Sequence, residues 1–468
     1  MKILLVTYWG LTNMGGIWTY MKQLSDKLAE QGHEVTLMGS HVDSNTLYLL
    51  DRNVCFDKKA YYSALLPYLD PLRFPHLHQE HGIFSFELGR YVFEGGAAAL
   101  GLEQYDVIHA QDPISAYALR RVMKKAVPLV ASMHGALARE SYYEYRGLEP
   151  GLTQAEYESR PIWRYFRRME QLAVNAADLI LVSSQWIGQV VGGHGAPAER
   201  IHILPYGVNL KEYEAKAQVP STLKRQPGKK LIMYAGRLEY IKGVHVLISA
   251  LGLLHQRRGD WTCVIAGSGS LMEELKVQAQ ALGIQDDILF TGKIDNIPSA
   301  LTAADVYVQP SLQDTQPFSV TEAQLAGIAP VVAGTTGMPE MVRHGVTGWI
   351  VPAEHPAALA DQLELLLRDD GLRAGTGSAA RQWAMANRSL DTMVEGTLGV
   401  YRRALAMHNW PQHMQMSRGD RQPVRRIPDA FHPADLLNVI SPGNPLGPVL
   451  RSGLPADYQV PDANILPG

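Results

Sequence analysis

Short apolar runs of strand length alternate with longer segments of helical periodicity through residues 1–405 of this chain. Such alternation is typical of a parallel sheet that is covered by helices on both faces. In the first half, strands are expected at residues 3–8, 34–38, 107–110, 129–133, 179–183 and 201–204, and helices at 18–31, 116–125 and 163–177. The pattern starts again with strands expected at 231–235, 262–266, 288–291, 306–309 and 330–333. The chain is therefore predicted to form two doubly wound α/β units.

The length of the chain also favours two domains, because 468 residues with 46% hydrophobic content exceed what one ordinary core holds. We expect an N-terminal Rossmann-like domain over residues 1–208 and a C-terminal one over 231–385. The polar, proline-containing segment 209–230 is the expected linker. A helix over 386–407 is expected to pack back on the N-terminal domain.

The last part of the chain, residues 408–468, contains ten prolines and no sustained periodicity. This composition predicts an extended or partly ordered, proline-rich tail. The alternative is that residues 431–440 dock on the body of the protein as a short helix.

Composition argues against several classes of protein. A formal net charge of −3 provides no basic field for nucleic acid. Cys55 and Cys263 are the only cysteines and lack C-x-x-C spacing, so neither a disulfide framework nor a zinc site is indicated, and a cytoplasmic setting is expected. No stretch approaches the roughly 18 apolar residues of a spanning helix. Any membrane contact is therefore expected to be peripheral.

The first strand is followed by a turn that ends in Gly15 and Gly16 and leads into a helix. Backbone amides at such a turn can face a phosphate or a sugar closely. The alternative is a tight turn without a ligand. The G-x-G-x-x-G spacing of dinucleotide-binding turns is absent, which argues against an NAD-dependent enzyme.

A second cluster of polar residues follows strands of the second half. Arg237 and Lys242 lie between Gly236 and Gly243, directly after the strand at 231–235. Two cations at the carboxyl edge of a doubly wound sheet could hold a diphosphate without a metal ion. The alternative is a solvated, charged loop. Gly267 similarly ends the strand at 262–266.

Two carboxylates follow the strand at 306–309. Asp314 is expected in a polar loop and Glu322 on the helix after it. Glu322 is flanked by apolar residues, and an acid in such surroundings needs a partner. A ribose diol and an ordinary salt bridge are both candidate partners.

In their order and spacing these motifs resemble the GT-B fold glycosyltransferases commonly called family 4. The resemblance rests on the G-R-L-x-x-x-K-G run at 236–243, the strand-loop-helix run at 310–327 and the Gly-Val-Asn at 207–209. It covers roughly residues 1–405. It implies two Rossmann-like domains that face each other across a cleft, with the donor on the second and the acceptor on the first.

The resemblance also implies roles for individual residues. Arg237 and Lys242 match the pair that binds the donor diphosphate, and Glu322 matches the glutamate that binds the donor ribose. His134 matches a histidine near the reaction centre, although a lone histidine is more often structural. The remaining nucleotide-sugar positions would be Gly15, Gly16, Gly267, Ile294 and Asp314, and the catalytic set His134, Arg237, Lys242 and Asp314.

Two residues depart from the family pattern. The family usually has a glutamate where this chain has Asp314, which is one methylene shorter, and an aspartate where it has Asn209. The identity of the donor sugar is therefore open. A specialised subgroup would account for the difference.

The function implied is metal-independent transfer of a hexose, with retention of configuration, from a nucleotide sugar that is most often a UDP-sugar. A leaving phosphate oxygen would accept the acceptor's proton, and no cofactor or D-x-D metal motif is expected. The sequence does not indicate the acceptor, the pathway or the oligomeric state. A nucleotide-sugar epimerase of similar fold and a non-catalytic nucleotide-sugar-binding protein are the alternatives.

Two further segments carry weaker indications about the acceptor side. An aromatic loop expected at 141–146 could stack on a sugar ring or simply pack on the domain. Arg164, Arg167 and Arg168 with Trp163 form a basic start to a helix, which could touch anionic lipid or be a solvated face.

Overall fold

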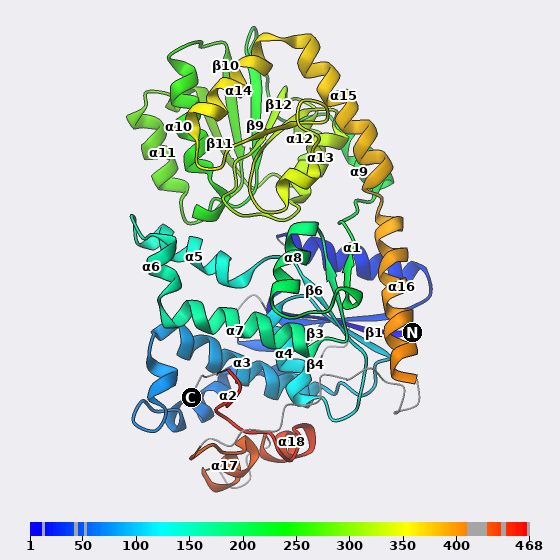
Figure 1. Cartoon of the computed structure of the whole chain (residues 1–468). Coiled ribbons are helices and arrows are strands. Elements are labelled where there is room, and N and C mark those ends of the chain that lie inside the picture. The colour runs from blue at the N-terminus through cyan, green and yellow to red at the C-terminus, as the bar shows by residue number, and fades with distance from the viewer. Residues whose placement is uncertain (12–14, 42–44, 51–53, 410–427, 441–445, 466–468) are drawn as a thin grey trace.

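The computed structural model describes residues 1–11, 15–41, 45–50, 54–409, 428–440 and 446–465. Two sheets, one mainly and one wholly parallel, are each covered by helices and form two lobes that are stacked one above the other (Figure 1). The predicted α/β class is confirmed. Among the described residues, no helix combines the length and apolarity required to cross a membrane.

The N-terminal sheet has eight strands: β1 (Lys2–Gly10), β2 (Glu34–Ser40), β3 (Thr46–Leu49), β4 (Val54–Asp57), β5 (Val107–Ala110), β6 (Leu129–Met133), β7 (Leu179–Val182) and β8 (Ile201–Ile203). Their order is β4-β3-β2-β1-β5-β6-β7-β8. The six predicted strands are parallel, whereas β3 and β4 form an unpredicted antiparallel extension. Helices of this lobe are α1 (Gly16–Glu30), α2 (Lys58–Leu65), α3 (His81–Leu100), α4 (Pro113–Val122), α5 (Leu137–Leu148), α6 (Gln154–Glu158), α7 (Pro161–Ala176) and α8 (Gln185–Gly193).

The C-terminal sheet has six parallel strands in the order β11-β10-β9-β12-β13-β14. They are β9 (Lys230–Ala235), β10 (Trp261–Ala266), β11 (Ile288–Gly292), β12 (Val306–Gln309), β13 (Ala329–Ala333) and β14 (Trp349–Val351). The helices are α9 (Leu210–Ala217), α10 (Val244–His255), α11 (Met272–Ala281), α12 (Ile297–Leu301), α13 (Phe318–Leu325), α14 (Pro356–Arg368) and α15 (Asp370–Asn387). Burial on both faces explains why these strands read as apolar runs in the sequence.

Two segments cross between the lobes and run side by side. Val208 donates its N–H to the carbonyl of Arg388 at 2.8 Å, and Leu390 donates to the carbonyl of Val208 at 3.1 Å. A Cβ at Gly207 would lie 2.4 Å from the carbonyl oxygen of Ser389, so only glycine fits this close crossing. The segment 209–230 begins with α9, which packs against α12 of the C-terminal lobe.

The helix that follows the second crossing, α16 (Leu390–Asn409), descends along the N-terminal lobe (Figure 1). Its buried face joins a core cluster with Ile3 and Leu24, because Val394 and Leu398 point inward. Tyr401 of α16 bonds to the imidazole of His109 on β5 at 2.7 Å. The N-terminal unit is therefore assembled from residues at both ends of the sequence.

The expectation of an extended tail is wrong for residues 428–440 and 446–465, and the alternative, a short helix at 431–440 that docks on the body of the protein, is confirmed. The helices α17 (Pro433–Ile440) and α18 (Leu446–Gly453) pack on each other, and α18 packs on α3. The prolines do not break them, because Pro433 is the first residue of α17 and Pro448 lies in the first turn of α18. This C-terminal segment covers the end of the N-terminal lobe away from the C-terminal lobe (Figure 1).

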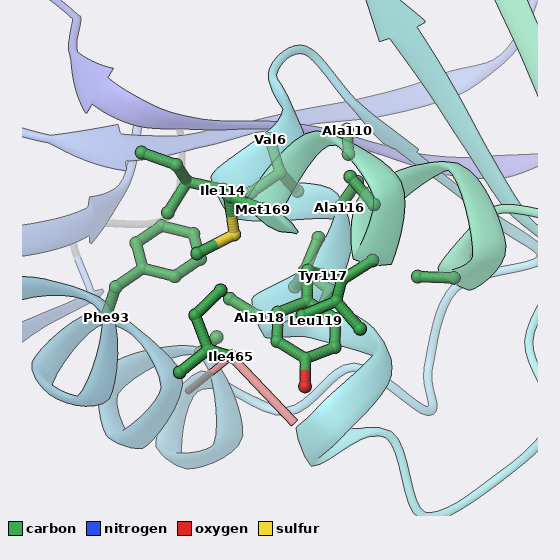
Figure 2. Packing of buried hydrophobic residues seen from close by; sticks show 14 of the residues in the cluster. Val6, Phe93, Ala110, Ile114, Ala116, Tyr117, Ala118, Leu119, Met169 and Ile465 are labelled. Carbon is green, nitrogen blue, oxygen red and sulfur yellow. The ribbon is translucent and has the colours of Figure 1, made fainter. Parts of the chain in front are cut away.

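Buried charges fasten the C-terminal segment to α3 and α4. Arg90 is fully buried and bonds to Glu87 at 2.6 and 2.9 Å, to Glu94, and to Asp462 at 3.1 Å. Arg121 pairs with Asp462 at 2.7 Å and with Glu94 at 3.0 Å. Next to this charge cluster, Ile465 lies among buried side chains of the N-terminal core (Figure 2).

Candidate active site between the two lobes

The carboxyl ends of the two sheets face each other, and loops from both lobes meet there. Thr315 donates its hydroxyl to the carbonyl of His134 at 2.7 Å. The side-chain amide of Gln316 accepts from the N–H of Tyr206 at 2.8 Å and donates to its carbonyl at 3.0 Å. Glu340 accepts from the first two backbone N–H groups of α8, at 2.7 and 2.8 Å. These contacts describe a closed arrangement of the lobes.

Glycines allow three loops of the C-terminal lobe to touch backbone to backbone. Gly267 has a φ of +148°, and a Cβ there would lie 1.8 Å from the carbonyl oxygen of Gly236. Gly243 is left-handed with a φ of +65°, and a Cβ there would lie 2.2 Å from the carbonyl oxygen of Pro310. Any side chain at these positions would separate the loops that follow β9, β10 and β12.

The two predicted cations differ in their surroundings. Arg237 is exposed, and among the described residues no carboxylate lies within 4.0 Å of its guanidinium group. Lys242, in contrast, forms an ion pair with Asp314, with 2.5 Å between Nζ and Oδ2. Asp314 is itself fixed by Thr336, whose hydroxyl accepts its N–H at 3.1 Å. Arg237 is therefore free to bind an anion, while Lys242 shares its charge with Asp314.

His134 follows β6 and sits in a network of uncharged groups. The Oε1 of Gln111 lies 3.1 Å from Nε2 and can only accept, so Nε2 carries the proton and Nδ1 accepts from the Tyr206 hydroxyl at 2.5 Å. Burial lowers the pKa of His134 to about 4. The imidazole is thus neutral at pH 7. Tyr206 in turn stacks on Phe318, the first residue of α13, at 5.4 Å.

Glu322 lies on α13 with most of its surface covered. Burial raises the pKa of its carboxyl to about 7, and the charge of Lys216 acts weakly in the opposite direction. Among the described residues, no hydrogen bond or ion pair to this carboxylate is present. The salt bridge considered from the sequence is therefore not formed. A carboxylate in such surroundings is suited to accept hydroxyl groups of a ligand.

Sequence reasoning missed Glu140, which lies on α5. Its Oε1 would be 1.8 Å from a Cβ at Gly135, the residue after His134, so the carboxylate occupies the space that glycine leaves. Burial raises the pKa of Glu140 to about 7, with Lys242 opposing the shift and Asp314 adding to it. Glu140 was not found because its segment did not read as a helix.

The aromatic loop expected at 141–146 is wrong, because these residues lie within α5. Tyr142 and Tyr143 are buried in the core of the N-terminal lobe. Arg146 forms an ion pair with Glu354 of the C-terminal lobe at 2.8 Å. The segment therefore closes the interface between the lobes and does not present stacked rings to a ligand.

The remaining predicted residues lie at the edges of the site. Gly15 has a φ of +93°, with no heavy atom near its missing Cβ, and Gly16 begins α1. Tyr20, one turn into α1, contacts His134 edge to face at 5.0 Å. Ile294 follows β11 and packs on the apolar cluster beneath the sheet edge.

Side chains of the types that can bind metal ions lie apart from one another in the part of the chain that the structure describes. No group of three or more His, Cys, Asp or Glu side chains there is placed to hold a metal ion.

Each of the two lobes matches a family of known proteins. Residues 216–383 match the family model described as glycosyl transferases group 1, and residues 14–212 match the model described as glycosyltransferase family 4. An uncharacterized glycosyltransferase of Methanocaldococcus jannaschii is 26% identical over 87% of this chain and 99% of its own length. A D-inositol 3-phosphate glycosyltransferase of Paenarthrobacter aurescens is 30% identical over 59% of this chain and 68% of its own length.

A solved structure shares the fold. The Anabaena protein HepE, in complex with UDP and glucose, covers 86% of this chain and 100% of its own, with a TM-score of 0.59 and 20% identity.

Proposed function

Because the chain belongs to the glycosyl transferases group 1 family and has the GT-B fold, we propose that it transfers a hexose from a UDP-sugar to an acceptor hydroxyl with retention of configuration. The observation that carries this proposal is Arg237 at the carboxyl end of β9, where the two lobes meet; it is exposed, and its guanidinium has no ion-pair partner among the described residues. The complex of HepE with UDP and glucose supports the choice of donor.

In this proposal, Arg237 and Lys242 bind the diphosphate of the donor. Their charges stabilise the departing phosphate, which is the work that a metal ion does in other transferases. The Lys242–Asp314 ion pair holds the ammonium group at the edge of the site before the donor arrives. Asp314 then remains close to the transferred sugar, where a carboxylate can accept its hydroxyl groups. No metal ion is required for these steps.

Glu322 binds the ribose hydroxyls, and the backbone around Ile294 contacts the nucleobase. The glycines at 15, 16 and 267 let the main chain approach the nucleotide sugar closely. His134 lies beside the reaction centre as a neutral imidazole, which Gln111 and Tyr206 hold in place through its two ring nitrogens. The acceptor attacks from the face that the nucleotide leaves, and a phosphate oxygen takes its proton. No side chain acts as a nucleophile.

We place the protein in the cytoplasm, since both of its cysteines are free. A peripheral membrane contact through α7 would have to be electrostatic. Phe166 is 2% exposed, and the apolar face of α7 is therefore already packed in the core.

The test is to incubate the protein in EDTA with UDP-, GDP- and ADP-sugars and to measure heat stability and release of nucleoside diphosphate. Stabilisation and slow release with one UDP-sugar are expected. Arg237→Gln should abolish both, whereas Arg368→Gln, a matched change at an exposed arginine of the same lobe, should not.

The other outcomes distinguish the alternatives. Conversion of the sugar without release of the nucleotide would identify an epimerase. Stabilisation without any turnover, with acceptor alcohols present, would identify a non-catalytic nucleotide-sugar-binding protein.

A further inference from the structure

A cavity of about 370 Å³ lies on the N-terminal lobe, between the exposed face of α7 and the end of α8. Its walls include Trp163, Arg164, Arg167, Arg168, Gln171 and His194. The volume falls at the lower end of the range of small-ligand sites. None of these residues belongs to the candidate site between the lobes, so the cavity is separate from that site.

Three guanidinium groups line this cavity, and none of them forms a direct ion pair with a carboxylate of the described residues. Among the described residues, no Asp or Glu oxygen lies within 4.0 Å of Arg164, Arg167 or Arg168. Arg164 donates to the carbonyl of Ser159 at 3.1 Å, and Arg168 to the side chain of Gln171 at 2.7 Å. Like charges three and four residues apart on a helix repel each other. A bound anion would relieve this repulsion.

The walls are held in place from three parts of the chain. Arg167 donates to Nε2 of His194 at 3.3 Å, and Glu170 lies beside the same ring, 3.2 Å from Nε2. Glu170 is 5% exposed and accepts from the N–H of Ala138 at 3.3 Å. Arg168 donates Nε to the carbonyl of Asn464 in the C-terminal segment at 2.9 Å. A site that is ordered before binding loses less entropy when a ligand enters.

We propose that this cavity binds a phosphate group, carried by a soluble phosphate monoester or by a lipid headgroup. Guanidinium groups form paired hydrogen bonds with phosphate oxygens, and Arg167 is exposed and lines the cavity. Trp163 offers a ring surface beside the arginines for the organic part of the ligand. The site is independent of the proposed transferase reaction.

The test is calorimetric titration with inorganic phosphate and phenyl phosphate against chloride at equal ionic strength. The Arg237→Gln protein is used throughout, so that the proposed diphosphate site does not contribute. Adding Arg167→Gln should weaken phosphate binding about tenfold or more, as expected for a lost charged hydrogen bond. The matched change Arg403→Gln, at an exposed arginine of α16, should leave it unchanged. Equal binding by all three proteins, or no binding, overturns the proposal.

The source of the phosphate is distinguished with vesicles of phosphatidylcholine that contain phosphatidic acid or, at equal surface charge, phosphatidylserine. Preference for phosphatidic acid that Arg167→Gln removes supports a lipid headgroup. Binding of soluble phenyl phosphate without such preference supports a soluble ligand. If both vesicle types are bound by the protein with Arg167 and by the protein with Arg167→Gln, and soluble phosphate is not bound, the attraction is due to diffuse charge. That result overturns the proposal of a phosphate-binding cavity. Melting temperatures check that the variants are folded.

Discussion

Replacing Arg90 by methionine tests the buried charge cluster that fastens the C-terminal segment to the N-terminal lobe. Arg90 and Arg121 are its two cations, and Glu87, Glu94 and Asp462 are its three anions. Arg90→Met leaves three buried carboxylates with one cation. Breaking a buried pair in this way costs about 3–5 kcal/mol of the free energy of unfolding. For a unit of this size the melting temperature should fall by about 6–20 °C.

Asp462→Asn is the comparison variant, because it leaves two carboxylates with two cations. Its cost should be smaller, about 1–3 kcal/mol for the lost hydrogen bonds to charged groups. Differential scanning calorimetry and guanidinium unfolding give both values, and Arg403→Met on the exposed face of α16 is the control. The reasoning is refuted if Arg90→Met costs no more than Asp462→Asn.

The pH dependence gives an independent check on Asp462. Burial raises the pKa of its carboxyl, but Arg121 and Arg90 outweigh burial and hold it below the usual value. Asp462 therefore stabilises the fold above about pH 4, where an unfolded aspartate is ionised, and this contribution is lost as the pH falls further. The difference in the free energy of unfolding between wild type and Asp462→Asn should have its full size at pH 7 and should disappear below pH 4.

Three further predictions concern the cleft. Glu322→Gln should weaken UDP binding at least tenfold in titration calorimetry while leaving the melting temperature of the free protein unchanged or higher, since it removes a largely covered carboxylate that has no hydrogen-bond or ion-pair partner among the described residues; unchanged affinity would exclude Glu322 from the nucleotide site. Glu140→Gln should stabilise the protein above pH 7 but not at pH 4. The pKa of the Glu140 carboxyl is raised to about 7, so ionising it lowers the free energy of unfolding, by at most about 3 kcal/mol and by less because the residue is partly exposed. A stability difference that does not depend on pH would contradict this. Gly267→Ala should lower both the melting temperature and UDP affinity, since its Cβ would meet the Gly236 carbonyl, whereas Gly259→Ala, in open space, should change neither; equal effects would show that the close contact does not matter.

The main strands of both sheets were predictable from sequence, because strands buried on both faces appear as uninterrupted apolar runs. Strands β3, β4 and β14 were not, since they lie at or next to the edges of their sheets, where only some of their residues are buried. The prolines of the C-terminal segment were read as breakers. They are compatible with helices because they lie in the first turns of α17 and α18.

In the candidate site, the sequence motif located Arg237 and Lys242 but not the difference between them. The partner of Lys242 is Asp314, 72 positions later, and such a pairing depends on how β9 and β12 lie side by side. Glu140 could have been suggested only after its segment was recognised as a helix. That segment is rich in tyrosine, and its helical form is stabilised by burial of Tyr142 and Tyr143, which a local pattern does not report.

The buried charge cluster also has a consequence for synthesis on the ribosome. Asp462 emerges 372 positions after Arg90, which corresponds to roughly 20–75 s of translation. During that interval the C-terminal sheet, whose strands are all encoded between these two residues, can be completed, while Arg90 and Arg121 still lack the carboxylate that the C-terminal segment contributes. The lobe that is started first is thus the lobe that is finished last, and interruption of translation before residue 462 leaves Arg90 and Arg121 with Glu87 and Glu94 but without Asp462.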